Sequence, residues 1–334
     1  MRELRVMTEN GRPSPDPLRV FVLGATGTIG RATVRALARR GHDVVCLTRS
    51  PGATPDRANV AYRQGDATDP ASLVRDGFCG ERFDALVSCM ASRTGAPADA
   101  WAIDHQAHVD ALAPARASGV THMVLLSAIC VQKPLLAFQQ AKLAFERELM
   151  ESGLDWSIVR PTAFFKSLSG QVERVRGGKS FLVFGDGELT ACKPIGDDDL
   201  GAYLADCLDD ETRRNHILPI GGPGPAITPR EQGERLFELM GKPPRFRHVP
   251  VAMLDVIAGT LGALGRVSPA LAAKADLARI GRYYATESML VLDPATGRYD
   301  VDATPSFGTE TLFDYYARLV AGEAEAERGD HAVF

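Results

Sequence analysis

The 334-residue sequence has no strong excess of charge, no paired cysteine motif and no long uninterrupted apolar run. A net charge of -4 gives no reason to expect nucleic acid as a partner. The cysteines are scattered without a Cys-x-x-Cys pair, which argues against zinc, iron–sulfur and disulfide frameworks and suits a reducing cytosol. We therefore expect a cytoplasmic protein and predict no metal site.

The longest apolar segment runs from Val249 to Gly265, is interrupted by Asp255 and several glycines, and is too short to span a membrane. We interpret it as a buried helix; the alternatives are a cap over a ligand site or a contact with a membrane surface. Residues 1–17 are polar and lack an apolar h-region, which predicts a disordered tail rather than a signal peptide. The acidic, alanine-rich residues 321–334 are expected to form a second flexible tail.

The most informative motif is a glycine-rich turn directly after a short apolar strand. Residues 18–23 lead into Gly24-Ala25-Thr26-Gly27-Thr28-Ile29-Gly30, here called the glycine loop, and a helix-prone stretch follows. Glycines let the backbone approach a pyrophosphate, and the start of the helix points free N–H groups at the anion. The Gly-x-x-Gly-x-x-Gly spacing is typical of short-chain dehydrogenases/reductases. We predict dinucleotide contacts from Gly24, Thr26, Gly27, Thr28, Ile29 and Gly30.

The end of the second predicted strand selects the cofactor. NAD enzymes usually carry an acid there, which binds the ribose 2′-hydroxyl and would repel a 2′-phosphate. This chain reads Leu47-Thr48-Arg49-Ser50 instead. Arg49 offers a fork of donors to a phosphate and Ser50 adds a hydroxyl, so we predict NADPH as the cofactor. The alternative for Arg49 is a solvated loop cation.

From residue 18 to residue 160, apolar strands alternate with helices. This pattern predicts an α/β fold with a doubly wound parallel sheet of the Rossmann type, covered on both faces. After Arg160 the alternation fades and prolines become frequent. We therefore assign residues 18–160 to an NADP-binding domain and residues 161–320 to a smaller C-terminal substrate lobe with some return to the sheet.

Ligands of such sheets bind beyond the carboxyl ends of the strands, which directs attention to the residues that follow each strand. Asp66 and Ala67 follow the third strand, and Asp66 is positioned to accept a hydrogen bond from the adenine amino group. The alternative for Asp66 is a helix cap before Pro70. Cys89 follows the fourth strand and is expected along the nicotinamide ribose, and Ser127 follows the fifth.

The tyrosine of the usual Tyr-x-x-x-Lys motif is missing. Short-chain reductases place Tyr and Lys on one helical face, where the Tyr protonates the alkoxide formed from a ketone. Here the motif reads Phe138-Gln139-Gln140-Ala141-Lys142. Either the domain binds a nucleotide without catalysis, or its substrate does not need a strong acid at that point. A positioned donor is worth roughly 3–4 kcal/mol when charge collects on one oxygen. Reduction of an alkene conjugated with a large π system spreads that charge, so C=C reduction is favoured over carbonyl reduction.

Several later segments resemble one family, the NADPH-dependent 8-vinyl reductases of divinyl (proto)chlorophyllide a, which occur in plants and many phototrophic bacteria. The resemblance covers residues 18–320 and is carried by FQQAKLAFE at 138–146, VRPTAFFKSL at 159–168, FGDG at 184–187, CKPI at 192–195, YYATESMLVLDP at 283–294 and TPSFG at 304–308. The family also has Phe at the tyrosine position. The resemblance implies reduction of a vinyl group to ethyl on a magnesium tetrapyrrole, in chlorophyll or bacteriochlorophyll synthesis.

The resemblance also implies roles for individual residues. Lys142 would position the nicotinamide ribose and Ser127 would lie near the reacting group. Contacts with the nicotinamide are expected from Pro161, Thr162 and Phe164, and contacts with the pigment from Phe138, Phe164, Phe165 and residues 181–184. The candidate cations for a pigment carboxylate are Lys166, Arg174, Lys193 and Arg282. A pigment that partitions into lipid would place the protein at the periphery of a photosynthetic membrane.

Two alternatives stay open. The first is an atypical reductase of another conjugated alkene, although such relatives lack the Glu287-Ser288-Met289-Leu290 block. The second is a non-catalytic NADP-binding sensor or assembly protein.

Overall fold

The computed structural model describes residues 16–50, 55, 57–265 and 268–325. Most of the two predicted tails, residues 1–15 and 326–334, lies outside the described residues. Within the described part, Ala321 ends the last helix and Gly322 caps it in the left-handed conformation, with φ of 78°.

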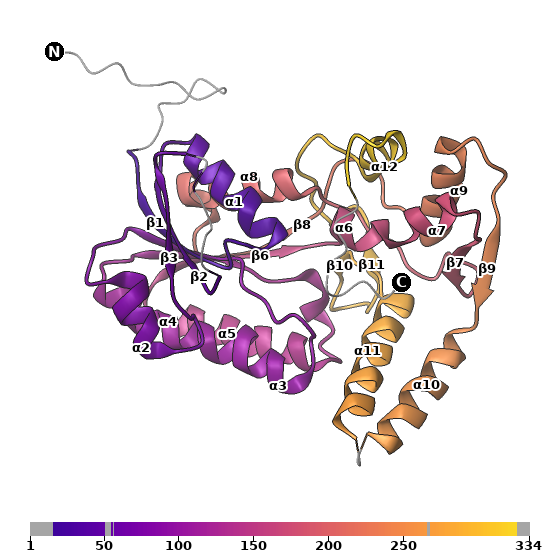
Figure 1. The fold of residues 1–334 in the computed structure, drawn as a ribbon, viewed down its shortest axis with the longest axis horizontal. Coiled ribbons are helices and arrows are strands. Elements are labelled where there is room, and N and C mark those ends of the chain that lie inside the picture. The colour runs from indigo at the N-terminus through magenta and orange to yellow at the C-terminus, as the bar shows by residue number, and fades with distance from the viewer. Residues whose placement is uncertain (1–15, 51–54, 56, 266–267, 326–334) are drawn as a thin grey trace.

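The centre of the molecule is a seven-stranded sheet whose strands are all parallel (Figure 1). Its order is β3 (Val60–Gln64), β2 (Asp43–Thr48), β1 (Arg19–Leu23), β4 (Ala85–Ser88), β5 (His122–Leu126), β6 (Asp155–Pro161) and β8 (His216–Ile220). The chain order reverses direction between β1 and β4, which makes the crevice above these two strands the expected ligand site. The predicted Rossmann-type fold is confirmed.

Helices cover both faces of the sheet because successive residues of each strand point to opposite sides. Val20 and Val22 pack under α1 (Thr28–Arg39) and α8 (Asp197–Asp209). Phe21 and Leu23 pack on the opposite side. That side carries α2 (Pro70–Ser72), η1 (Leu73–Phe78), α3 (Pro97–Ala100), η2 (Trp101–Gln106), α4 (Ala107–Ala117) and α5 (Ala137–Glu151).

The second lobe is built from shorter elements around a separate apolar core. They are η3 (Ile129–Gln132), α6 (Phe165–Leu168), η4 (Ser169–Gln171), α7 (Val172–Arg176), β7 (Phe181–Phe184), α9 (Pro229–Leu239), β9 (Phe246–Val249), α10 (Val251–Leu264), α11 (Pro269–Thr286), β10 (Val291–Leu292), β11 (Tyr299–Asp300) and α12 (Leu312–Ala321). β7 pairs with β9 in parallel, and β10 pairs with β11 in the antiparallel direction.

Helix α10 corrects the interpretation of residues 249–265 as a buried helix. Only Ala258 is buried in α10, whereas Val256 is 66% and Met253 is 46% exposed. The helix packs along α11, and the two form a hairpin that projects from the second lobe (Figure 1). Among the described residues, no helix combines the length and the apolar character needed to cross a membrane.

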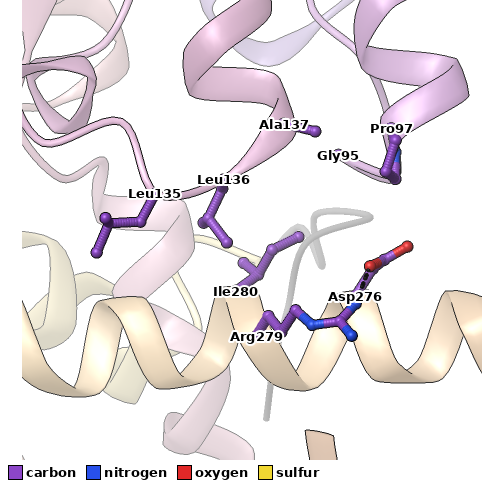
Figure 2. A pocket seen from close by; sticks show the side chains of 8 residues that line it. All are labelled: Gly95, Pro97, Leu135, Leu136, Ala137, Asp276, Arg279 and Ile280. Carbon is purple, nitrogen blue, oxygen red and sulfur yellow. Dashed lines mark hydrogen bonds and ion pairs between the residues drawn. The ribbon is translucent and has the colours of Figure 1, made fainter. Parts of the chain in front are cut away.

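Helix α11 also reaches the start of α5, so the two lobes meet there. Figure 2 shows Ile280 of α11 directed toward Leu136 and Ala137. A Cβ built on Gly95 would lie 3.1 Å from Cδ1 of Ile280 and 3.5 Å from Cδ1 of Phe138. The α11 face that carries Ile280 is therefore packed against the turn of α5 that carries Phe138.

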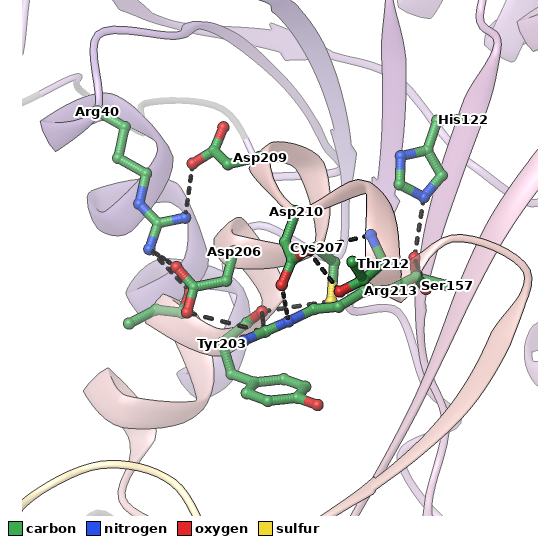
Figure 3. Close-up of polar contacts among 11 residues, drawn as sticks. Arg40, His122, Ser157, Tyr203, Asp206, Cys207, Asp209, Asp210, Thr212 and Arg213 are labelled. Atoms are coloured by element: carbon green, nitrogen blue, oxygen red, sulfur yellow. Dashed lines mark hydrogen bonds and ion pairs between the residues drawn. The ribbon is translucent and has the colours of Figure 1, made fainter. Parts of the chain in front are cut away.

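Helix α8 returns from the second half of the chain and packs against α1. A Cβ on Gly201 would lie 2.6 Å from the carbonyl carbon of Ala32, so the close approach of the two helices requires glycine. Charges fix the same contact (Figure 3): Arg40, the C-cap of α1, pairs with Asp206 and, at 3.1 Å, with Asp209. This contact holds α1, and with it the glycine loop, in place on the sheet.

Candidate active site

The glycine loop is shaped as a cradle for an anion. Gly24 has φ of +75°, and a Cβ on it would lie 2.5 Å from the backbone N of Met90. A Cβ on Gly30 would lie 2.0 Å from the carbonyl oxygen of Gly24. Gly27 caps α1 without a side-chain hydrogen bond, and the first turn of the helix contains no acid. The N–H groups of that turn therefore face a site suited to a pyrophosphate.

The remaining loop residues have distinct surroundings. Thr26 is exposed, and its carbonyl oxygen accepts a hydrogen bond from Arg31 at 2.8 Å. Ile29 is buried in the core beneath α1. The hydroxyl of Thr28 accepts a hydrogen bond from Nζ of Lys166 at 2.7 Å. Lys166 thus reaches the glycine loop from the second lobe.

The ends of β2 and β3 carry the residues predicted for the adenosine half of the cofactor. Arg49 and Ser50 are exposed at the end of β2. Asp66 accepts hydrogen bonds from the N–H and the hydroxyl of Thr68 at 2.9 and 2.8 Å. These bonds, more than nearby Arg49, lower the pKa of Asp66. The helix-cap alternative for Asp66 is wrong, because Asp69 caps α2 by accepting from the N–H of Ala71 at 3.0 Å.

Two further predicted residues, Ala67 and Cys89, follow the ends of β3 and β4. Ala67 is partly buried against the core on the α4–α5 side of the sheet. Cys89 follows β4, and its backbone lies directly under Gly24. Its Sγ is 3.5 Å from Oγ1 of Thr33 in α1. Burial raises the pKa of the Cys89 thiol to about 11.

A cavity of about 400 Å³ lies between the ends of β5 and β6 and the second lobe. This size is within the range of roughly 300–1,000 Å³ that is usual for small-molecule sites. Six of the predicted site residues line it, namely Ser127, Phe138, Lys142, Pro161, Thr162 and Phe164. All four residues of β7 line it as well. Phe165 lies outside the lining, buried and stacked on Tyr315 with 5.5 Å between ring centroids, and Lys166 is also outside.

Lys142 is held by an acid that sequence reasoning missed. Its Nζ lies 3.0 Å from Oδ1 of Asp104, a carboxylate with a fully buried side chain on η2. The N–H of Ser92 donates to the same oxygen at 3.3 Å. The second oxygen, Oδ2, is buried and has no hydrogen-bond partner within the described part of the chain. No spacing in the sequence marks this acid as a partner of Lys142.

Ser127 is the first member of a buried chain of polar groups. Its hydroxyl donates to Oε1 of Glu146 at 2.5 Å. Glu146 is also paired with the guanidinium of Arg160, whose Nε donates to Oε1 at 3.2 Å. The hydroxyl proton of Ser127 is therefore directed at Glu146 and away from the cavity.

Three residues that sequence reasoning gave no role also line the cavity: Cys130, Tyr284 and Glu287. Nζ of Lys133 donates to both carboxylate oxygens of Glu287, at 2.7 and 2.8 Å. The hydroxyl of Tyr299 donates to Oε2 of Glu287 at 2.7 Å. Tyr284 and Glu287 belong to the YYATESML segment, so the resemblance pointed to the segment but not to its place beside Lys142.

The four candidate cations for a pigment carboxylate all lie outside the cavity lining. Arg174 donates to the carbonyl oxygen of Ser180 at 2.8 Å and Lys193 to that of Thr304 at 2.9 Å. Arg282 pairs with Asp255 of α10. Among the described residues, Lys142 is the cation that lines the cavity. Within the described residues, no cluster of three or more His, Cys, Asp or Glu side chains could hold a metal ion.

The chain matches known proteins at three levels. A family model described as NAD(P)H-binding matches residues 24–211. Divinyl chlorophyllide a 8-vinyl-reductase of Oryza sativa is 48% identical to this chain, and the match covers 96% of this chain and 83% of the rice protein. The enzyme of the same name from Arabidopsis thaliana is 45% identical, over 95% of this chain and 80% of the Arabidopsis protein. The NADPH complex of the quinone oxidoreductase QOR2 of Escherichia coli matches with a TM-score of 0.62 and 17% identity over 91% of this chain and 99% of its own, which supports the fold. By its identity with the plant enzymes over almost its whole length, this chain belongs to the NADPH-dependent divinyl chlorophyllide a 8-vinyl-reductase family.

Proposed function

We propose that this protein reduces the 8-vinyl group of divinyl chlorophyllide a or protochlorophyllide a to an ethyl group, using NADPH, in chlorophyll or bacteriochlorophyll synthesis. One observation carries the proposal. The cavity at the strand ends is lined mainly by apolar side chains and contains Lys142, but has Phe138 where a ketone reductase has tyrosine. An apolar cavity of this kind suits the edge of a flat conjugated ring better than a sugar or a small ketone.

The residues present fit NADPH. The glycine loop leaves room for the pyrophosphate because a Cβ at Gly24 or Gly30 would collide with backbone. Arg49 at the end of β2 would bind the 2′-phosphate. Lys142 and the unpaired Oδ2 of Asp104 would hold the hydroxyls of the nicotinamide ribose as donor and acceptor. When bound, NADPH supplies the hydride for the reduction.

The protein residues would then orient the pigment and exclude water. Pro161, Thr162 and Phe164 form one wall of the cavity and β7 forms part of another. The side chain of Thr162 is fixed because its hydroxyl donates to the carbonyl oxygen of Lys193. Since the negative charge of the reduced vinyl group spreads into the macrocycle, no oxyanion site is required, and Ser127 can remain bonded to Glu146.

We propose a different role for Lys166 from the one that the resemblance suggested. Its Nζ lies beside the N-terminus of α1, where the helix dipole disfavours a cation unless an anion is present. The pyrophosphate of NADPH would supply that anion. Lys166 would therefore bind the cofactor from the second lobe rather than a pigment carboxylate.

The reaction is tested by incubating the purified protein with divinyl chlorophyllide a and NADPH and recording the Soret band. We expect a blue shift with NADPH and a much slower one with NADH. Divinyl protochlorophyllide a in a parallel assay identifies the preferred pigment. Tight NADPH binding without any shift would instead support a sensor or assembly protein, and turnover of another conjugated alkene alone would support the other reductase class.

We also propose that α10 contacts a membrane surface at the periphery of the photosynthetic membrane. The helix presents Met253, Val256 and Ile257 to solvent on a hairpin that projects from the lobe. Such a face can enter the headgroup region without spanning the bilayer. Sedimentation with vesicles of the neutral lipid phosphatidylcholine tests this contact. Binding should be lost in Met253→Ser/Val256→Ser and kept in Val74→Ser, which removes an equally exposed apolar side chain elsewhere.

A further inference from the structure

The geometry points to Tyr284 as the proton donor that replaces the missing tyrosine of α5: it enters the same cavity from α11, opposite Phe138 and Lys142. This inference rests on the proposed reduction of a vinyl group. The phenol would deliver its proton to the inner vinyl carbon after a hydride has reached the outer one.

The placement of Tyr284 follows from the contact between the two lobes. Tyr284 lies one helical turn after Ile280, so both side chains are on the same face of α11. That face meets the start of α5, where Ile280 and Phe138 approach the same point beside Gly95. Tyr284, Phe138 and Lys142 all line the cavity.

The residue next to Tyr284 fixes this part of α11 on η3. The hydroxyl of Tyr283 donates to the carbonyl oxygen of Cys130 at 2.9 Å. The side chain of Cys130 is buried and lines the same cavity as Tyr284 and Lys142. This contact therefore holds the end of α11 that carries Tyr284 at the cavity.

The other groups that line the cavity are poorer proton donors. The hydroxyls of Ser127 and Thr162 are already donated, to Glu146 and to a backbone carbonyl. Glu287 accepts hydrogen bonds on both oxygens from Lys133 and Tyr299.

Lys142 is paired with Asp104, and the thiols of Cys130 and Cys192 are buried, with 4% and 6% of each residue exposed. The remaining hydroxyls, those of Ser92, Ser167 and Thr190, are aliphatic and less acidic than a phenol.

The surroundings of Tyr284 suit this role. Tyr284 is 42% exposed and lines the cavity. Desolvation of the phenol, together with nearby Cys130, raises the pKa of Tyr284 well above its usual value, so that the phenol keeps its proton at neutral pH.

The proton transfer balances in atoms and charge. The O–H bond of Tyr284 breaks and a C–H bond forms at the inner vinyl carbon, using the former π electron pair of the vinyl group that hydride addition to the outer carbon leaves there. The resulting phenolate then regains a proton from water.

The test compares Tyr284→Phe with Tyr283→Phe, a matched change of the adjacent phenol, which does not line the cavity. We expect Tyr284→Phe to lower kcat at least 100-fold while the affinity for divinyl chlorophyllide a, measured by its absorbance change on binding, stays within threefold. Tyr283→Phe should keep kcat within threefold. In Tyr284→Ala, added phenol should raise the reduction rate at least tenfold.

Full turnover by Tyr284→Phe would overturn the proposal and make water the proton source. A loss explained by weaker pigment binding, or a lack of phenol rescue in a variant that binds pigment, would reduce Tyr284 to a positioning residue and also overturn it. Failure of the wild-type protein to shift the Soret band would instead contradict the proposed function itself.

Discussion

Asp104 and Lys142 form an ion pair in a place where a lone charge would be unstable. The side chain of Asp104 is fully buried and that of Lys142 is 11% exposed. Removing one partner of such a pair leaves an uncompensated buried charge, at a cost of about 3–5 kcal/mol. A loss of activity in a single variant at either position would therefore mix a catalytic effect with a folding effect.

We predict that the double variant Lys142→Met/Asp104→Leu separates the two effects. Lys142→Met alone should lose about 3–5 kcal/mol of unfolding free energy in urea, because Asp104 stays buried without its partner. The double variant should regain most of this stability but remain at least roughly 100-fold slower in kcat, because the ribose is no longer positioned. Near-normal turnover in the double variant would show that Lys142 has only a structural role.

Arg49 is expected to discriminate between the two nicotinamide cofactors. It is exposed at the end of β2, and a fork of donors there gains energy only from the 2′-phosphate of NADPH. Arg49→Ala should raise the Kd for NADPH at least roughly tenfold, the equivalent of about 1.4 kcal/mol, and leave that for NADH within twofold. Fluorescence titration of the reduced cofactors measures both constants. Equal losses for the two cofactors would remove the assignment of Arg49 to the phosphate.

Among the elements, α8 supports the helix behind the glycine loop although it carries none of the predicted site residues. It packs on α1, whose first turn forms the anion cradle, and Gly201 sets the distance between the two helices. A shift of α8 would therefore displace the N–H groups that face the pyrophosphate.

We expect Gly201→Ala to destabilise the protein by about 1–3 kcal/mol, because the new Cβ would lie 2.6 Å from the backbone of Ala32. Urea unfolding measures this loss, and the Kd for NADPH should rise in parallel. Gly259→Ala is the matched control in a helix, since open space surrounds Gly259 and alanine favours a helix by about 1 kcal/mol. If Gly201→Ala were as stable as this control, the close contact would not be limiting.

At the scale of the whole molecule, two histidines among the described residues, His108 and His122, are buried without charge. His108 bonds to the Ser88 hydroxyl at 2.7 Å, and His122 bonds to the Ser157 hydroxyl at 3.0 Å (Figure 3). Burial lowers the pKa of each imidazole to about 4, aided by Lys142 for His108 and by Arg214 for His122. In the unfolded chain the same groups titrate near 6.5.

The stability of the protein should therefore fall as the pH drops from 6.5 toward 4. In this range the unfolded state binds more protons than the folded state, so acid favours unfolding; above pH 6.5 the contribution is constant. At pH 5 the loss should be about 2 kcal/mol for each histidine, before the paired carboxylates begin to protonate. Urea unfolding at pH 7.5 and pH 5 measures the difference. His216→Asn should not change it, because His216 is exposed, whereas a flat profile would contradict the buried neutral state.

The amino-acid sequence alone predicted the alternating strands and helices of the Rossmann half, with a first strand at residues 18–23 that the structure has at Arg19–Leu23. It also predicted the glycine loop and the place of Lys142 on α5. These features depend on backbone geometry and on side-chain periodicity over about ten residues, so the local sequence contains the necessary information.

Only the tertiary structure decided which distant residues meet at the site. The second lobe folds back over the sheet and so places Tyr284 in the same cavity as Lys142. It also brings Lys166 to Thr28, although 138 residues separate the two in the chain. The same holds for α10, whose apolar residues would suit a core but which packs mainly along α11 and stays largely exposed. Such contacts depend on how whole elements pack, which no local pattern of residues records.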